Sequence, residues 1–201
     1  MGHHHHHGLP DRSREGVRAV AIALGLLALT AALQAVIYVA SGSVALLADL
    51  IHNGGDALTA VPIGIAFLLQ SPRLERWAGI AVVLAIFVSA CVSLYEATAR
   101  LIDPQPLSHL GALAVAGVAG FAGNEAAAWV RLRAGRRLAS PALVADGYHA
   151  RTDGLVSLGV VASALAVWAG LEIADPAIAL AITLVILRIT WQSWRTVRSG
   201  H

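Results

Sequence analysis

The chain contains no lysine and one cysteine, Cys91, and only 13% of its 201 residues are charged. A single cysteine excludes an intrachain disulfide. A soluble domain carries about a quarter charged residues, whereas here 57% of the residues are hydrophobic and the mean hydropathy is +0.70. These values indicate a membrane protein. The net charge of +2 does not indicate a nucleic-acid partner, because the arginines follow the ends of apolar segments.

Six apolar segments are long enough to cross a bilayer, which requires about 20 residues in a helix. The sequence therefore predicts an all-α membrane protein with six transmembrane helices, at about 18–40, 44–69, 77–100, 109–131, 142–169 and 175–194. Residues 1–10 (MGHHHHHGLP) are typical of an expression tag and carry no functional argument. We expect residues 11–201 to form one transmembrane domain.

Arginines gather at alternate ends of these segments, in the order Arg12, Arg14, Arg18, Arg73, Arg76, Arg131, Arg133, Arg136, Arg137, Arg195 and Arg198. In this assignment the group from 131 to 137 forms the loop between the fourth and fifth helices. Cytoplasmic loops carry an excess of basic residues. Both termini are therefore predicted to be cytoplasmic, with the chain in the inner membrane of a bacterium.

One sequence pattern occurs twice. The segment ALLADLIHNGGDALTA (45–60) recurs in altered form as ALVADGYHARTDGLVS (142–157), and both contain Asp-x-x-His-x-x-x-Asp. The copies fall in the second and fifth predicted helices, which run in opposite directions. This arrangement predicts a 3+3 inverted repeat, a plan in which transporters place the substrate site near the membrane midplane.

The repeated residues suit a divalent metal. Residues i and i+4 share a helical face, so His52 lies with Asp56 and His149 with Asp153. Ionisable groups inside a membrane are costly and usually mark an ion or proton path. Two such helices in contact would present two imidazoles and two carboxylates, a set that tetrahedral zinc accepts. Cobalt, cadmium, iron and manganese also fit, whereas copper(I) would favour sulfur ligands.

The sequence predicts close contact between these two helices, because small residues let membrane helices approach. Gly54 and Gly55 flank the first His–Asp pair, and Gly147 and Gly154 flank the second.

Three other interpretations fit the same residues. Each His–Asp pair could be a separate buried hydrogen bond without a metal. His52 and His149 could instead be axial ligands of a haem in a membrane redox protein, although the paired carboxylates would have no clear role there. The chain could also be a metal-binding scaffold that does not transport.

Three polar residues could line the approaches to the site. Asp49 and Asp146 each precede a histidine by three residues and share its face. By topology Asp49 lies on the outer side and Asp146 on the inner side, so we expect them to attract cations at the two entrances; the alternative is a solvated or capping role. Asn124 could line the cytoplasmic approach or hydrogen-bond to a neighbouring helix.

Two further polar residues are predicted to hold helices together. Arg151 lies about 200° around its helix from His149 and is expected to pair with Glu96 or Glu125. Gln34 is expected to form an interhelical hydrogen bond.

The motifs LLADLIHNGGDAL and LVADGYHARTDGL, on the second and fifth of six helices with both ends inside, resemble the cation diffusion facilitator family. The His-x-x-x-Asp pair on both helices is similar to its zinc-transporting members. The resemblance covers about residues 15–198. It implies a homodimer with a metal site in each protomer, formed by His52, Asp56, His149 and Asp153. It also implies efflux of divalent metal from the cytoplasm in exchange for protons by alternating access, so the chain is not expected to be an enzyme.

Two departures from the family pattern are visible. Members usually continue after the sixth helix into a cytoplasmic domain, which we expect to be absent here. The segment between the second and third helices, from Ser71 to about Arg76, is also short, so no additional metal site is expected in it.

Overall fold

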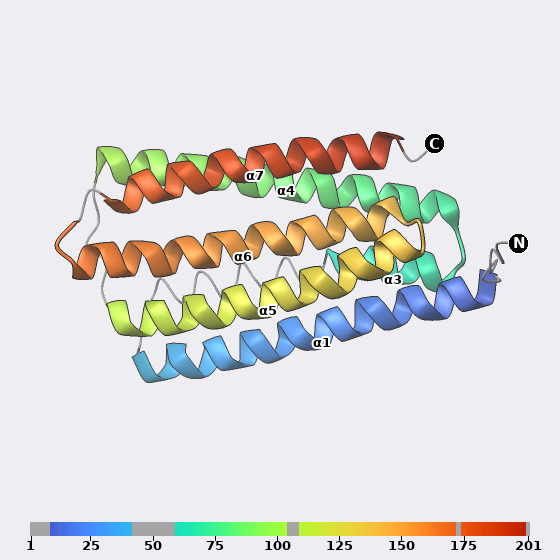
Figure 1. Ribbon diagram of the computed structural model, residues 1–201, viewed down its shortest axis with the longest axis horizontal. Helices are drawn as coiled ribbons and strands as arrows, with labels where there is room; N and C mark the ends of the chain where they lie inside the picture. Colours follow the sequence, from blue (N-terminus) through green and yellow to red (C-terminus); the bar gives the residue numbers. More distant parts are fainter. Residues whose placement is uncertain (1–8, 42–58, 104–108, 172–173, 200–201) are drawn as a thin grey trace, which may run out of the picture.

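The computed structural model describes residues 9–41, 59–103, 109–171 and 174–199. In these ranges the chain is helical and contains no strand, which confirms the predicted all-α class. The helices are α1 (Leu9–Ser41), α3 (Ala60–Leu68), α4 (Pro72–Ile102), α5 (Leu110–Arg137), α6 (Pro141–Trp168) and α7 (Ala174–Ser199). They run side by side, with α5 and α6 between α1 and the α4–α7 pair (Figure 1).

Four of the described helices are long and apolar enough to cross a membrane: Asp11–Ser41, Pro72–Ala99, Leu110–Arg137 and Pro141–Trp168. The chain is therefore a multi-pass membrane protein. Of the predicted helix at 44–69, the described part is α3 with one residue on either side, Thr59 and Leu69. The count of six spans, the 3+3 inverted repeat and the cytoplasmic termini remain predictions.

Serine–proline pairs begin α4 and α6. The Ser140 hydroxyl accepts a hydrogen bond from the Leu143 amide at 3.2 Å, and Ser71 accepts one from Leu74 at 3.3 Å. Such a cap satisfies an amide at the helix start, and proline in the first turn needs no partner for its nitrogen. The start expected near 142 is confirmed within one residue, at Pro141. Helix α4 begins five residues before the predicted 77, because its first turn is charged and escapes an apolar window.

The end of α5 also differs from the prediction, because charged residues at a helix end fall outside an apolar window. The helix continues to Arg137 rather than ending near 131, and a short turn through Ala139 leads into α6. Arg131 therefore belongs to a helix and not to a loop. This correction changes its role, as described below.

Helices α5 and α6 pack through glycines at near-backbone distance. A Cβ atom on Gly135 would lie 2.8 Å from the Val144 nitrogen, and one on Gly147 would lie 3.0 Å from the Leu132 nitrogen. We call this contact the glycine seam. Small residues permit such approach in membranes. Gly147 and Gly154 were expected to face the second predicted helix, but the contacts described for them are with α5.

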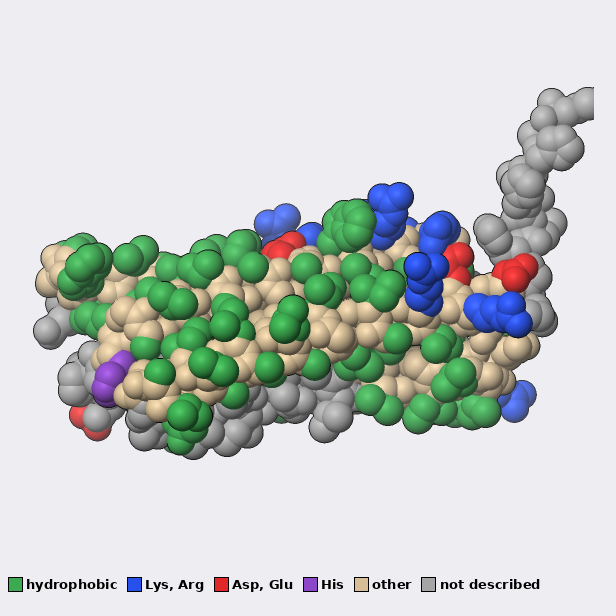
Figure 2. Space-filling view, turned by 90° about the horizontal axis from the view of Figure 1, so that it is seen from below, with side chains coloured by type: hydrophobic (Ala, Val, Ile, Leu, Met, Phe, Trp, Pro, Cys, Tyr) green, Lys and Arg blue, Asp and Glu red, His purple; other side chains and the backbone are tan. Residues whose placement is uncertain are grey.

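The main apolar core lies where α1, α3, α4, α6 and α7 meet, around Ile63, Phe67, Ile86, Leu143 and Ile186. The outer surface is largely apolar as well, with basic side chains concentrated toward one end of the molecule (Figure 2). That distribution suits a helix bundle surrounded by lipid. The interhelical hydrogen bond predicted for Gln34 is confirmed, because its Nε2 donates to the Ala116 carbonyl of α5 at 3.3 Å.

Candidate metal site

His149 and Asp153 lie one turn apart on the buried face of α6. Their exposed fractions are 0% and 6%, and His149 Nδ1 is 3.8 Å from Asp153 Oδ1. Zinc binds imidazole nitrogen and carboxylate oxygen at about 2.0–2.2 Å, so one ion could contact both atoms. The Thr152 hydroxyl donates to the His149 carbonyl at 2.6 Å and is satisfied within the helix.

The other half of the predicted site, His52 and Asp56, lies outside the described residues, as does Asp49. Among the described residues, no group of three or more His, Cys, Asp or Glu side chains is placed to hold a metal ion. The structure therefore brings together the α6 pair, and the four-ligand set remains a prediction.

Asp146 is fully buried one turn before His149, and its partner is Arg131 of α5. The Arg131 Nε lies 3.0 Å from Asp146 Oδ2, with side-chain exposures of 1% and 0%. The hydroxyl of Thr59, just before α3, is 3.5 Å from the second carboxylate oxygen. This network joins α5 and α6 to the start of α3 beside the candidate metal pair.

The inward position of Arg131 has a signal in the sequence, which a hydropathy window does not detect. Asn124, Ala128, Arg131 and Gly135 follow a helical spacing of four, three and four residues, and all are buried. They form the face of α5 that packs on α6. The other residues on this face have small or amide side chains. An arginine among them is expected to face a neighbouring helix and to need an acidic partner there.

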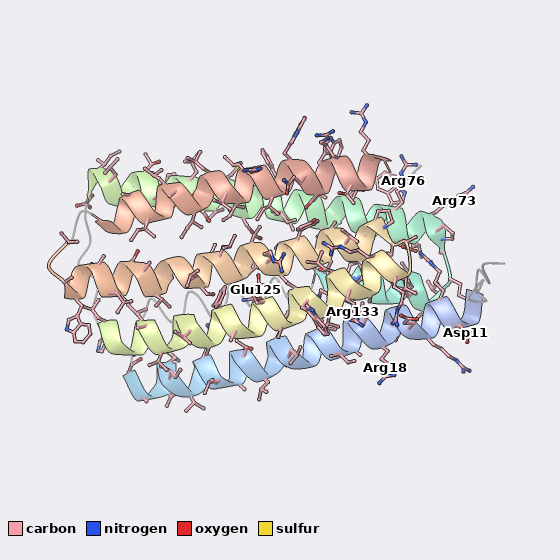
Figure 3. The ribbon with its side chains drawn as sticks, viewed as in Figure 1. Asp11, Arg18, Arg73, Arg76, Glu125 and Arg133 are labelled. Atoms are coloured by element: carbon pink, nitrogen blue, oxygen red, sulfur yellow. The ribbon has the colours of Figure 1, made fainter. Side chains whose placement is uncertain are left out.

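A corresponding stripe on α6 leads to the candidate site. Ala142, Asp146, His149 and Asp153 are buried and share one helical face. Ala142 is nearest the end of the bundle where Arg18, Arg73 and Arg76 are seen (Figure 3). We call this the arginine-rich end. The order along the face, from that end inward, is Ala142, Asp146, His149 and Asp153.

Asn124 and Arg151 occupy different sides of this arrangement. Asn124 is buried against α6, where a Cβ atom on Gly154 would lie 3.4 Å from its own Cβ. It is thus near the level of Asp153. Arg151 pairs with Glu125, which confirms one of its two predicted partners, through contacts of 2.8 and 3.0 Å.

Comparisons with known proteins agree with this architecture. A family model described as the cation efflux transmembrane domain matches residues 20–199. A probable cation efflux system protein of Mycobacterium tuberculosis is 50% identical over 198 residues, which is 93% of this chain and 60% of that protein.

More distant relatives carry more specific names. The zinc transporter ZitB of Escherichia coli is 29% identical over 96% of this chain and 65% of its own length. A protein of Bacillus velezensis named as a cadmium, cobalt and zinc/H(+)-K(+) antiporter is 25% identical over 94% of this chain and 62% of its own. This chain thus spans about 60–65% of the length of these relatives. The match over residues 20–199 places the chain in the cation efflux, or cation diffusion facilitator, family.

Proposed function

We propose that the chain transports divalent metal cations out of the bacterial cytoplasm, with zinc as the preferred cargo and protons as the counter-ion. The observation that carries this proposal is the buried pair of His149 and Asp153 on α6, 3.8 Å apart, in a chain of the cation efflux family. His52 and Asp56 would complete the transport site from the second predicted helix. Relatives named as a zinc transporter and as a cadmium, cobalt and zinc antiporter support the choice of cargo.

The chemistry of these ligands explains why protons would be exchanged. A metal ion binds neutral imidazole and ionised carboxylate, so binding displaces protons. Protons arriving from the opposite side would then compete with the metal and release it. In a six-helix, inverted-repeat bundle with cytoplasmic termini, the second and fifth helices would move against the third and sixth.

The working unit we propose is a homodimer with one transport site in each protomer, as the family resemblance implies. Asp146 and Asp49 would belong to the inner and outer approaches, whereas Asn124, near the level of Asp153, would lie beside the metal pair itself. Cobalt, cadmium, iron and manganese would bind to the same nitrogen and oxygen ligands. Affinity order alone does not set the selectivity among these metals.

The test is zinc uptake into liposomes that contain the purified protein, with and without a proton gradient. We expect gradient-dependent uptake in the parent and its loss in Asp153→Ala and His149→Ala. Asp11→Ala is the matched control, because it removes an exposed carboxylate at the start of α1. Uptake that is unchanged in Asp153→Ala would refute the site, and zinc binding without uptake in the parent would indicate a scaffold.

A further inference from the structure

Arg131 is set apart from the other arginines at its end of α5. Arg133, Arg136 and Arg137 are exposed, whereas Arg131 is 1% exposed and faces α6. Its guanidinium is a permanent charge, and it lies against Asp146 inside the helix bundle. The charge of Asp146 is thus already balanced by a cation that belongs to the chain.

The pair is incompletely hydrogen-bonded. Arg131 Nη2 is buried and makes no hydrogen bond to any described residue, and the Nε–Oδ2 approach of 3.0 Å does not have hydrogen-bond geometry. A buried ion pair is favourable only when its remaining donors and acceptors are satisfied. A contact with these defects is a poor device for stability alone, and it suits an interaction that must break and reform.

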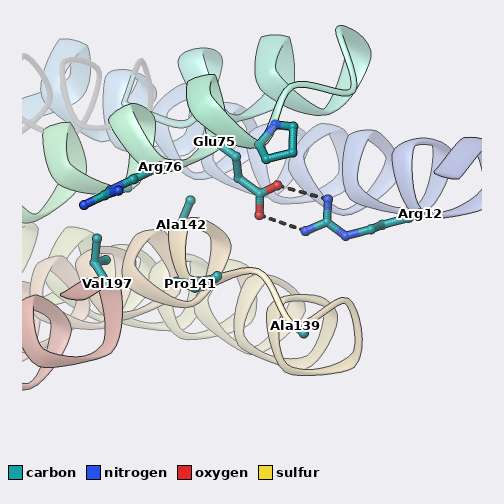
Figure 4. Close-up of a pocket in the computed structure, with 9 residues that line it drawn as sticks. Arg12, Glu75, Arg76, Ala139, Pro141, Ala142 and Val197 are labelled. Atoms are coloured by element: carbon teal, nitrogen blue, oxygen red, sulfur yellow. Dashed lines mark hydrogen bonds and ion pairs between the residues drawn. The ribbon is translucent and has the colours of Figure 1, made fainter. Parts of the chain in front are cut away.

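The position of the pair suggests what it controls. At the arginine-rich end a cavity of about 230 Å³ is lined by residues that include Glu75, Arg76 and Ala142 (Figure 4). Ala142 lies on the same α6 face as Asp146 and His149. A cation moving inward along this face would therefore meet Asp146 before it reached the metal pair.

Helices α4 and α6 touch at Ala142, beside this cavity. A Cβ atom on Gly79 of α4 would lie 3.0 Å from the Ala142 Cα, so the two helices are in near-backbone contact there. At the cavity, Glu75 is held by both terminal nitrogens of Arg12 at 3.0 Å (Figure 4). Among the described residues, the two carboxylates met before the metal pair, Glu75 and Asp146, thus each lie against an arginine.

We propose that Arg131 is an internal cation that holds Asp146 until a divalent metal ion displaces it, which keeps the route from the arginine-rich end to His149 and Asp153 closed. Arg131 is in this view a positioning residue and not a metal ligand. A divalent ion carries twice the charge of the guanidinium and interacts correspondingly more strongly with the carboxylate. The inference rests on the proposed function, because it assumes that metal ions use this route.

The test is a cycle of zinc affinities, measured by titration calorimetry on purified protein at constant pH. Arg131→Met removes the competing cation and frees Asp146, so zinc should bind about tenfold more tightly, as expected for coupling between close charges. Asp146→Asn leaves the arginine charge unopposed near the site, so zinc should bind about tenfold more weakly. The double variant should return to within a few-fold of the parent.

The opposite changes in zinc affinity expected for Arg131→Met and Asp146→Asn distinguish this role from a structural one. A pair that only holds helices together would lower the melting temperature in both single variants and would not raise zinc affinity in either. Arg133→Met is the matched control, since it changes an exposed arginine on the same helix. A folded Arg131→Met protein with unchanged or weaker zinc affinity would overturn the proposal.

A second measurement decides the matter if a single variant does not fold. Thr59→Cys, in a Cys91→Ser background, places a thiol beside Asp146. Arg131→Met and Asp146→Asn are then added together, which removes the ion pair and leaves the net charge unchanged. A positively charged, membrane-impermeant thiol reagent should modify this Thr59→Cys protein about tenfold faster than the Thr59→Cys protein that keeps the pair. An unchanged rate would refute the closed route. A parent protein that binds no zinc would instead refute the proposed function, and the labelling result would still report on the route.

Discussion

Arg151 of α6 and Glu125 of α5 form a two-point ion pair, with Nε 2.8 Å from Oε1 and Nη2 3.0 Å from Oε2. Their side chains are 38% and 31% exposed. Arg151 follows His149 by two residues and so projects from another side of α6. The pair therefore ties two helices together without entering the candidate metal site.

We expect Arg151→Met to destabilise the protein by about 1 kcal/mol or more, because it leaves the Glu125 carboxylate uncompensated within the apolar layer. The double variant Arg151→Met with Glu125→Gln should recover most of that loss, since neither charge remains. Thermal unfolding in detergent, followed by circular dichroism, measures both. Zinc affinity should be unchanged in both variants, and a large fall in it would show that the pair contributes to the site.

A second expectation concerns the stability of variants in the glycine seam. In Gly135→Ala the new Cβ would meet the Val144 backbone nitrogen at 2.8 Å, so α5 and α6 must separate, at a cost of about 1–3 kcal/mol. Gly111→Ala is the control on the same helix, where no atom lies within 4 Å and where alanine favours the helix by up to about 1 kcal/mol. Equal stability of the two variants, measured by thermal unfolding, would contradict the close approach.

A third expectation concerns the contact between α1 and α4. Arg12 binds Glu75 through two nitrogens and donates from Nε to the Leu138 carbonyl at 3.2 Å. Arg12→Met should lower the free energy of unfolding by about 1–3 kcal/mol, because it leaves a nearly buried carboxylate without its donors. Arg14→Met, an exposed neighbour on the same helix, should change it little. Chemical denaturation of both variants tests this, and similar losses would show that the contact is incidental.

Proton release on zinc binding is the fourth expectation. Protons and metal compete for the same imidazole and carboxylate atoms, so zinc affinity should fall as the pH is lowered. Titration calorimetry in two buffers of different ionisation enthalpy measures the protons released at pH 6.5. Fewer should be released on zinc binding by His149→Ala, if binding persists there. A parent that binds zinc without releasing protons would argue against exchange.

The parts of this molecule that were predictable from sequence are those in which a local pattern has one physical solution. Long apolar runs must be helical in lipid, because every backbone polar group needs an internal partner. Ser140 and Pro141 fix a helix start through a cap that is itself local. Arg151 could be assigned one of two acidic partners, and Gln34 could be expected to hydrogen-bond to another helix, because polar groups in an apolar layer need partners on adjacent helices.

The parts that were missed depend on which helix faces which. Arg131, at the end of the predicted fourth helix, is grouped with the loop arginines because a hydropathy window ends where charges begin, although its spacing from Asn124 and Gly135 places it on a buried face. The contact of Gly147 with Leu132 of α5 was also missed, because a small residue indicates close approach without indicating the partner. Such information is held in the tertiary arrangement and not in the local sequence.

The glycine seam has a mechanical consequence. Two helices that touch at backbone distance cannot slide past one another without steric clash, so α5 and α6 move as one rigid unit. Arg131 of α5 and His149 of α6 then keep a constant backbone spacing when other helices move. A change at Asp146 must consist of side-chain rotation, while larger displacements fall to the α4–α7 pair and to α1.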